Sequence, residues 1–394
     1  MLPQHHSKSH AMSEEGRLEF YNNLGHNLRV HAEQLAWCHQ VCAQNPENMC
    51  MLTIFRLSYI YTDLSSSIRA CLSTKDDYER YYQIKYLWVN LHEAYKAIYN
   101  NASDGDSYLA QFLAAYPEAR RTQEYIAAVE KLEILWKIIM KDLRLPRNSY
   151  SHFDKDVCKT INFLSDINSE EAPAHYSSEI LEIILLLTQV CRQFIPLGTH
   201  VPKEPMQKHI LEPAIEHLRA LMRRKEKLIT AMNGVFACAL KEIKRGKCIC
   251  TLQDLVPRTK QMRSAKVWNA GMLIHILRAD MAAALMSGLR SEQELECRLN
   301  MRRMKIIRYE GLSQMSEMLK DLPEKEALRK EIDGIVHTLD SQYRNAAVHY
   351  RYGKIDYIPM AYADSTNPLE TLIDLLEIES FLKQLNRIRN ALLA

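Results

Sequence analysis

The feature that most restricts the fold of this chain is an order of segments that occurs twice. Displacing the sequence by 217 positions aligns YTDLSSSIRACLSTKDDYER, which starts at Tyr61, with RADMAAALMSGLRSEQELEC, which starts at Arg278. The two copies have the same residue at four aligned positions, which are Asp63 with Asp280, Leu72 with Leu289, Glu79 with Glu296, and Glu93 with Glu310. A repeat of this length predicts two related structural units within one chain.

Both copies have the pattern of helices. Only 11 of the 394 residues are Gly and 13 are Pro, and helix-forming residues dominate. Apolar residues recur at spacings of three and four from Leu18 to about Ala43 and from Met49 to Leu72, which is typical of amphipathic helices. Ser73 to Asp77 resembles the N-terminal cap of a further helix, with Ser or Thr accepting amide hydrogen bonds. We therefore expect an all-α protein.

The order of segments also divides the chain. Residues 1–17 are polar and lack periodicity, which predicts a disordered leader. Residues 18–195 form the expected N-terminal helical domain, and residues 207–394 form the C-terminal one. Between them, 196–206 has the Pro and Gly of a linker. These two domains are called the N-terminal half and the C-terminal half below.

Charge and cysteine content narrow the function. A net charge of +3 is too small for the whole surface to bind polyanions, so nucleic acid would require a local patch. Basic runs lie at Arg223–Lys227, Lys241–Lys247 and Arg298–Lys305, although such runs are more often solvated helix faces. The ten cysteines form no paired framework and no secretory signal is apparent, which favours free thiols in the cytoplasm. The longest apolar run, Ile180–Val190, is too short for a bilayer, so no membrane segment is expected.

A polar motif, Arg-Asn-x-x-x-His, also occurs twice. It comprises Arg147, Asn148 and His152 in LPRNSYSHFD, and Arg344, Asn345 and His349 in YRNAAVHYRY. The offset is now 197, so the second copy is twenty residues shorter between its helices and the motif. Pro146 predicts a helix start at the first motif. On a helix the Asn and His share one face, and the long Arg side chain reaches the same side.

These three side chains suit the cleavage of RNA by its own ribose 2′-hydroxyl. A guanidinium binds phosphate through paired hydrogen bonds, and a His transfers protons near neutral pH. The reaction requires neither a metal nor another cofactor. One His performs only one of the two proton transfers well, so two motifs brought face to face would supply both.

This pattern resembles the HEPN family (higher eukaryotes and prokaryotes nucleotide-binding), whose small helical bundles carry an Arg-x4-6-His motif. The resemblance covers about residues 18–394 as two HEPN-like units, which implies an intramolecular pseudo-dimer. It further implies a metal-independent endoribonuclease of toxins or antiviral defence, with RNA as substrate and control by an antitoxin or another regulatory protein. Most proteins of this family carry one motif and form homodimers, whereas this chain carries two. The sequence therefore does not decide whether the chain also forms a homo-oligomer.

The site residues follow from the motif and from the repeat. The family's motif matches the Arg, Asn and His of both copies as catalytic residues. The repeat adds four acidic residues that we expect to hold the Arg side chains in place, namely Asp63, Glu93, Asp280 and Glu310. Some family members carry a modifiable Tyr two residues after the His, where this chain has Arg351 instead.

Two other classes of function compete with this interpretation. In the first, a non-catalytic helical scaffold binds RNA, nucleotide or protein, and the Arg, Asn and His only fill polar gaps between helices. In the second, a metal-dependent hydrolase uses His and acidic residues, but no HExxH or similar spacing occurs. His92, His275 and His337 fit surface or satisfied core positions, and the tyrosines of Tyr78–Tyr82 fit helix packing better than base stacking.

Overall fold

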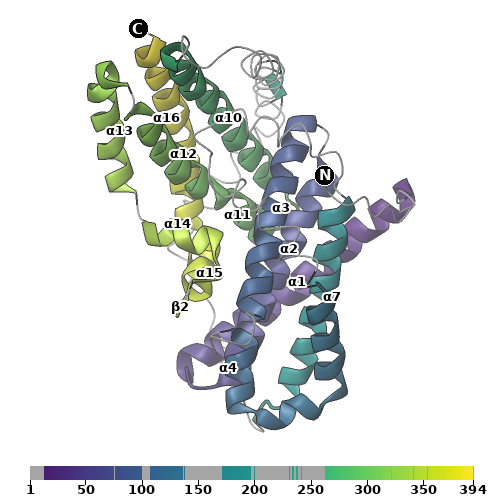
Figure 1. The fold of residues 1–394 in the computed structure, drawn as a ribbon. Helices are drawn as coiled ribbons and strands as arrows, with labels where there is room; N and C mark the ends of the chain where they lie inside the picture. Colours follow the sequence, from purple (N-terminus) through teal and green to yellow (C-terminus); the bar gives the residue numbers. More distant parts are fainter. Residues whose placement is uncertain are drawn as a thin grey trace.

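The computed structural model describes residues 13–74, 76–99, 107–135, 171–196 and 262–393, apart from 321, 340 and 353, with a few isolated positions between these ranges. Within these residues the chain is almost entirely helical, which confirms the predicted all-α class (Figure 1). The elements of the N-terminal half are α1 (Glu14–Gln44), α2 (Met49–Ser73), α3 (Asp77–Ile98), α4 (Tyr108–Ala115), the 3-10 helix η1 (Pro117–Arg121) and α7 (Glu171–Arg192). Those of the C-terminal half are α10 (Met262–Arg290), α11 (Glu294–Met301), α12 (Arg303–Leu319), η3 (Pro323–Lys325), α13 (Glu326–Thr338), α14 (Ser341–Val348), α15 (Ile358–Thr366) and α16 (Pro368–Leu393).

The described residues include one short β-hairpin. The two-residue strand β1 (Arg351–Tyr352) pairs with β2 (Ile355–Asp356) in antiparallel register. Its place in the sequence matters more than its size. The hairpin begins two residues after His349, so it joins the C-terminal motif to α15.

Local capping explains where the N-terminal helices begin. The side chain of Asn48 accepts a hydrogen bond from the backbone N of Met51 and thereby starts α2. For α3 the predicted Ser or Thr cap is wrong, because Asp76 accepts the amide hydrogens of Tyr78 and Glu79. Thr74 instead ends α2. α1 begins at Glu14, so the helix starts inside the stretch predicted as a leader.

The helices form two groups that lie against each other (Figure 1). α1, α2, α3 and α7 form one group, and α10, α12, α13 and α16 form the other. Across the boundary, α3 packs against α10 and α2 packs against α11. The two halves of the chain therefore meet through α2 and α3 on one side and α10 and α11 on the other.

Each group buries side chains from the other half of the chain. The core around α10 and α12 contains the rings of Tyr78, Tyr82 and Tyr86 from α3. The core around α2 and α7 contains Leu299 of α11 and Tyr350 from the segment after α14. The exchange makes the two cores interdependent, and it confirms that Tyr78 and Tyr82 serve helix packing.

The helix that meets the length and composition of a membrane span, among the described residues, is not the one with the apolar run noted in the sequence. Ile180–Val190 lies in α7, whereas the stretch Val267–Arg290 of α10 is long and apolar enough to cross a membrane by length and composition alone. Most of that stretch is buried inside the protein, as in a central core helix. The described cysteines are free, and Cys38 and Cys42 contribute to the core as expected.

Candidate functional site

The C-terminal motif is carried by the short helix α14 and by the residue that follows it. Arg344 lies in the first turns of α14, and its guanidinium forms an ion pair with the carboxylate of Glu310 on α12. The Arg344 Nη1 atom also donates to Asn345 Oδ1 at 2.7 Å. The Arg344 side chain is only 12% exposed and that of Glu310 only 11%, so this ion pair is largely withdrawn from solvent.

The motif histidine is bound by a carboxylate from the other half of the chain. The backbone N of His349 donates to the carbonyl O of Asn345 at 2.8 Å, which continues the helical geometry to the His. Its Nδ1 lies 2.9 Å from Oε2 of Glu93 on α3. The other oxygen of Glu93, Oε1, lies 3.3 Å from Nδ1 of His92. All three side chains are buried.

The next residue contacts a second acidic position of the N-terminal half. The Tyr350 hydroxyl donates to Asp63 Oδ2 at 2.7 Å, and Arg302 Nη2 contacts the same oxygen at 2.5 Å. Burial raises the pKa of Tyr350 well above its usual value, and the neighbouring Asp63 charge raises it further. Burial opposes the charged form of Arg302, yet Asp63, Tyr59 and Tyr350 together outweigh that cost and the pKa of the guanidinium is raised.

The hairpin after the motif is fixed to the N-terminal half as well. Asp356 of β2 accepts hydrogen bonds from Arg56 Nε at 2.7 Å and from the Tyr108 hydroxyl at 2.9 Å. The Tyr108 hydroxyl also contacts the carbonyl O of Tyr350, at 3.0 Å. The segment that carries His349 is therefore held by successive contacts with α2, α3 and α4.

A matching contact runs in the opposite direction across the boundary. Asp280 of α10 lies 3.1 Å from Nζ of Lys85 and 2.7 Å from the hydroxyl of Tyr78, both on α3. Position 280 is 217 beyond 63, and 302 is 217 beyond 85. The ion pair of Asp63 with Arg302 therefore has a counterpart in the ion pair of Asp280 with Lys85. In the second pair, each residue lies 217 positions from the corresponding residue of the first.

Two further ion pairs cross the boundary near the turns that precede α3 and α11. Glu79 of α3 pairs with Arg290 of α10, and Glu296 of α11 pairs with Arg69 Nε at 2.7 Å. Glu79 and Glu296 again lie 217 positions apart, although the two arginines do not. Burial raises the pKa of Glu79 to about 7, and Arg290 partly offsets that rise.

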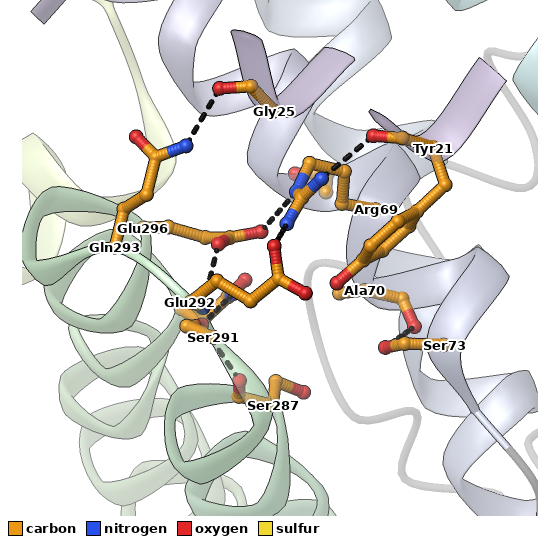
Figure 2. Close-up of polar contacts among 12 residues, drawn as sticks. Tyr21, Gly25, Arg69, Ala70, Ser73, Ser287, Ser291, Glu292, Gln293 and Glu296 are labelled. Atoms are coloured by element: carbon orange, nitrogen blue, oxygen red, sulfur yellow. Dashed lines mark hydrogen bonds and ion pairs between the residues drawn. The ribbon is translucent and has the colours of Figure 1, made fainter. Parts of the chain in front are cut away.

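Figure 2 shows how Arg69 joins three elements. Besides Glu296, its guanidinium contacts Glu292 Oε2 at 2.7 Å and the carbonyl O of Tyr21 at 2.6 Å. The guanidinium carbon lies 3.8 Å from the centre of the Tyr21 ring. Because the Arg69 side chain is only 1% exposed, this cluster fixes α1 and α2 to the turn between α10 and α11.

The structure places several of the predicted site residues in contact. Glu310 contacts Arg344, as expected, and Glu93 contacts His349. Asp63 and Asp280 hold Arg302 and Lys85, which lie outside the motif. Residues Arg147, Asn148 and His152 lie outside the described residues, so their placement relative to His349 is not described.

The basic run Arg298–Lys305 is neither a nucleic-acid patch nor a solvated helix face. Arg302 contacts Asp63, Arg303 contacts Ser67 and Gln83, and both arginines are buried. Lys305 pairs with Asp364. The expected solvation is wrong because this run lies where α11 and α12 meet the N-terminal half. The other two basic runs lie outside the described residues apart from Lys241.

Sequence reasoning missed Lys85, Arg302, His92 and Tyr350 as functional neighbours. A signal for the first two was available, because the displacement of 217 positions places Lys85 on Arg302 and conserves the positive charge. No comparable signal marked His92 or Tyr350. Tyr350 is 3% exposed and donates to Asp63, which makes its hydroxyl a poor target for modification.

Comparison with known proteins adds no family to this description. No family model, curated protein or solved structure matches the chain. No group of three or more His, Cys, Asp or Glu side chains suited to a metal ion occurs within the described part of the chain.

Proposed function

We propose that this protein is a HEPN-type endoribonuclease that cleaves RNA through attack of a ribose 2′-hydroxyl on the adjacent phosphate. The observation that carries the proposal is the 2.9 Å contact between His349 Nδ1 and Glu93 Oε2. A carboxylate that accepts the Nδ1 proton fixes the imidazole tautomer and its orientation, and it stabilises the imidazolium that forms when the ring accepts a second proton. His349 is thereby prepared to act as a base through Nε2.

Arg344 would supply the positive charge that the reaction requires. Its guanidinium is now paired with Glu310 and bonded to Asn345. In the reaction we expect the guanidinium to turn toward the phosphate, with which it can form two parallel hydrogen bonds. Asn345 would then bind a phosphate or ribose oxygen.

The contacts across the boundary support a duplicated, pseudo-symmetric arrangement. In a two-fold interface, each contact between positions i and j recurs with the partners exchanged. The pairs of Asp63 with Arg302 and of Lys85 with Asp280 have this relation. Under the proposal, the two HEPN-like halves pool their motifs, and Arg147, Asn148 and His152 complete the site with Arg344, Asn345 and His349.

The proposal is tested by RNA cleavage in the presence of a chelator. We expect the parent to cut single-stranded RNA and leave 2′,3′-cyclic phosphate ends, and we expect His349→Ala and His152→Ala each to reduce kcat by about 100-fold or more. His337→Ala is the matched control, because His337 is an exposed histidine on α13. Equal cleavage by all four proteins would reject the composite site.

The burial of the C-terminal motif favours a second candidate, a non-catalytic scaffold. Arg344 and His349 both face carboxylates and both are largely buried, which is also what a structural polar network requires. The scaffold predicts that parent protein binds RNA, nucleotide or a protein partner without cutting. It further predicts that His349→Ala lowers the unfolding temperature while binding persists.

A closed motif also suits the biological role that we propose. An uncontrolled cytoplasmic ribonuclease would harm its host, so a toxin or antiviral defence protein has to be held inactive until needed. The ion pair of Arg344 with Glu310 would provide this resting state, because it holds the guanidinium away from a phosphate. An antitoxin or other regulatory protein would then shift the equilibrium toward the open site.

A further inference from the structure

Glu93 is contacted by two imidazoles that come from different halves of the chain. His92 approaches Oε1 at 3.3 Å and His349 approaches Oε2 at 2.9 Å, each through Nδ1. Glu93 is 1% exposed, His92 is 6% exposed and His349 is 7% exposed. A buried carboxylate that is contacted through both of its oxygens cannot rotate freely about its last side-chain bond. The position of Oε2 therefore depends on the contact made by Oε1.

We propose that His92 is a positioning residue, which acts on His349 through Glu93 and commits His349 to the tautomer with its proton on Nδ1. In this arrangement His92 donates its own Nδ1 proton to Oε1, and the carboxylate plane is set so that Oε2 receives the proton of His349. The inference rests on the proposed function for its kinetic consequence only.

His92 does not belong to the duplicated pattern. The position 217 beyond it holds Tyr309, while Glu93 falls on Glu310. The Tyr309 ring lies 5.8 Å from the guanidinium carbon of Arg344 and brings no imidazole to Glu310. The two glutamates thus have different neighbours, and only Glu93 is shared by two histidines among the described residues. The role assigned to His92 is specific to the half of the site that contains His349.

Three substitutions separate this role from simple packing. His92→Asn keeps an N–H donor near the place of Nδ1, because the Asn amide nitrogen is the same number of bonds from the backbone as Nδ1. His92→Gln moves the donor one bond further out, toward the place of Nε2. His92→Phe fills the space without a donor. Thermal unfolding of all three variants verifies that each one is folded.

The first measurement is the pair of ¹⁵N imidazole chemical shifts of His349, assigned by their absence in His349→Ala. We expect the parent and His92→Asn to show a protonated Nδ1 and an unprotonated Nε2. In His92→Phe and His92→Gln we expect averaged shifts of a mixed tautomer population. This readout does not require cleavage, so it decides the positioning role even if the protein cuts no RNA.

The second measurement is RNA cleavage under saturating and limiting substrate. We expect kcat to fall about 10- to 100-fold in His92→Phe and His92→Gln, with KM unchanged, and to recover in His92→Asn. Unaltered His349 shifts and kcat in His92→Phe would overturn the proposal. So would equal behaviour of the Asn and Gln variants. Absence of cleavage in the parent would reject the proposed function and leave the spectroscopic comparison to judge His92.

Discussion

Asp63 accepts hydrogen bonds from both Arg302 and Tyr350 while its own side chain has no exposure to solvent. An unpaired charge at such a place would cost several kcal/mol, so each of these side chains requires the others. Composition and spacing identified Asp63 and its counterpart Asp280, because acidic residues in an apolar helical pattern stand out. They could not identify the partners, since a pairing across 239 residues of sequence depends on how the helices pack.

His31 gives the clearest prediction at the scale of a single residue. It is buried in α1, its ring is stacked on Tyr61 with 3.9 Å between the ring centroids, and its Nδ1 has no hydrogen-bond partner among the described residues. Burial lowers the pKa of His31 to about 4, and the charge of Arg192 lowers it further. The folded protein therefore holds His31 neutral at a pH where the unfolded chain binds a proton.

The sign of the effect follows from the lowered value. Above pH 6.5, the ordinary pKa of histidine, His31 is neutral in both the folded and the unfolded chain, and the folded state has its full stability. As the pH falls toward 4, the unfolded chain binds a proton at His31 and the folded state loses stability relative to it. The loss amounts to about 3 kcal/mol of unfolding free energy. Urea unfolding at pH 7.5 and pH 4.5 should show a smaller acid destabilisation in His31→Phe than in the parent, and His337→Phe should behave like the parent. An equal loss in all three proteins would contradict the assignment.

At the scale of elements, hydrophobic periodicity was a reliable guide. The expected helix Met49–Leu72 appears as α2 (Met49–Ser73), and the apolar run Ile180–Val190 lies within α7 (Glu171–Arg192). Periodicity did not show that the stretch 217 positions beyond α3 is divided into α11 and α12, with Arg302 between them. That division directs Arg302 and Arg303 at α2 and α3, so the same residues that seemed to form a solvated face became an interface.

The crossing of α10 and α12 yields a prediction at this scale. A Cβ atom added to Gly311 of α12 would collide with the side chain of Leu277 on α10, which is fully buried. Gly311→Ala should therefore lower the free energy of unfolding by about 1–3 kcal/mol through overpacking. Gly334 of α13 offers a matched control, because an added Cβ there meets nothing within 4 Å.

We expect the control substitution to change the free energy of unfolding in the opposite direction. Gly334→Ala should raise the stability by about 0.5–1 kcal/mol, since Ala favours the helix and no neighbour has to move. Chemical denaturation of both variants measures the difference. Similar effects of the two substitutions would mean that helix propensity, and not the close approach of α10 and α12, determines the outcome.

At the scale of the whole molecule, the two halves are joined by more than the covalent chain. Tyr78, Tyr82 and Tyr86 of α3 lie in the core of the C-terminal half, and Tyr350 lies in the core of the N-terminal half. The repeat in the sequence predicted two similar sets of helices. It could not predict that each set would bury part of the other, because low sequence identity carries no information on which faces meet.

This exchange predicts that neither half is stable alone. A half on its own would expose its donated rings and the apolar side chains around them to water, and each large apolar side chain that loses its burial costs about 1.5–3 kcal/mol. A typical domain is stable by only about 5–15 kcal/mol, so the loss of several such contacts is enough to unfold it. We expect chains divided within 196–206 to be insoluble or unfolded when produced singly.

Produced together, the same two chains should assemble, because the buried ion pairs and the exchanged rings remain complementary. Co-purification through a tag on one chain, followed by circular dichroism and thermal unfolding, measures this assembly against the undivided protein. Asp63→Arg in one chain should abolish the association, since it places two positive charges together at Arg302. A single half that unfolds cooperatively as a monomer would show that the boundary joins two independent domains.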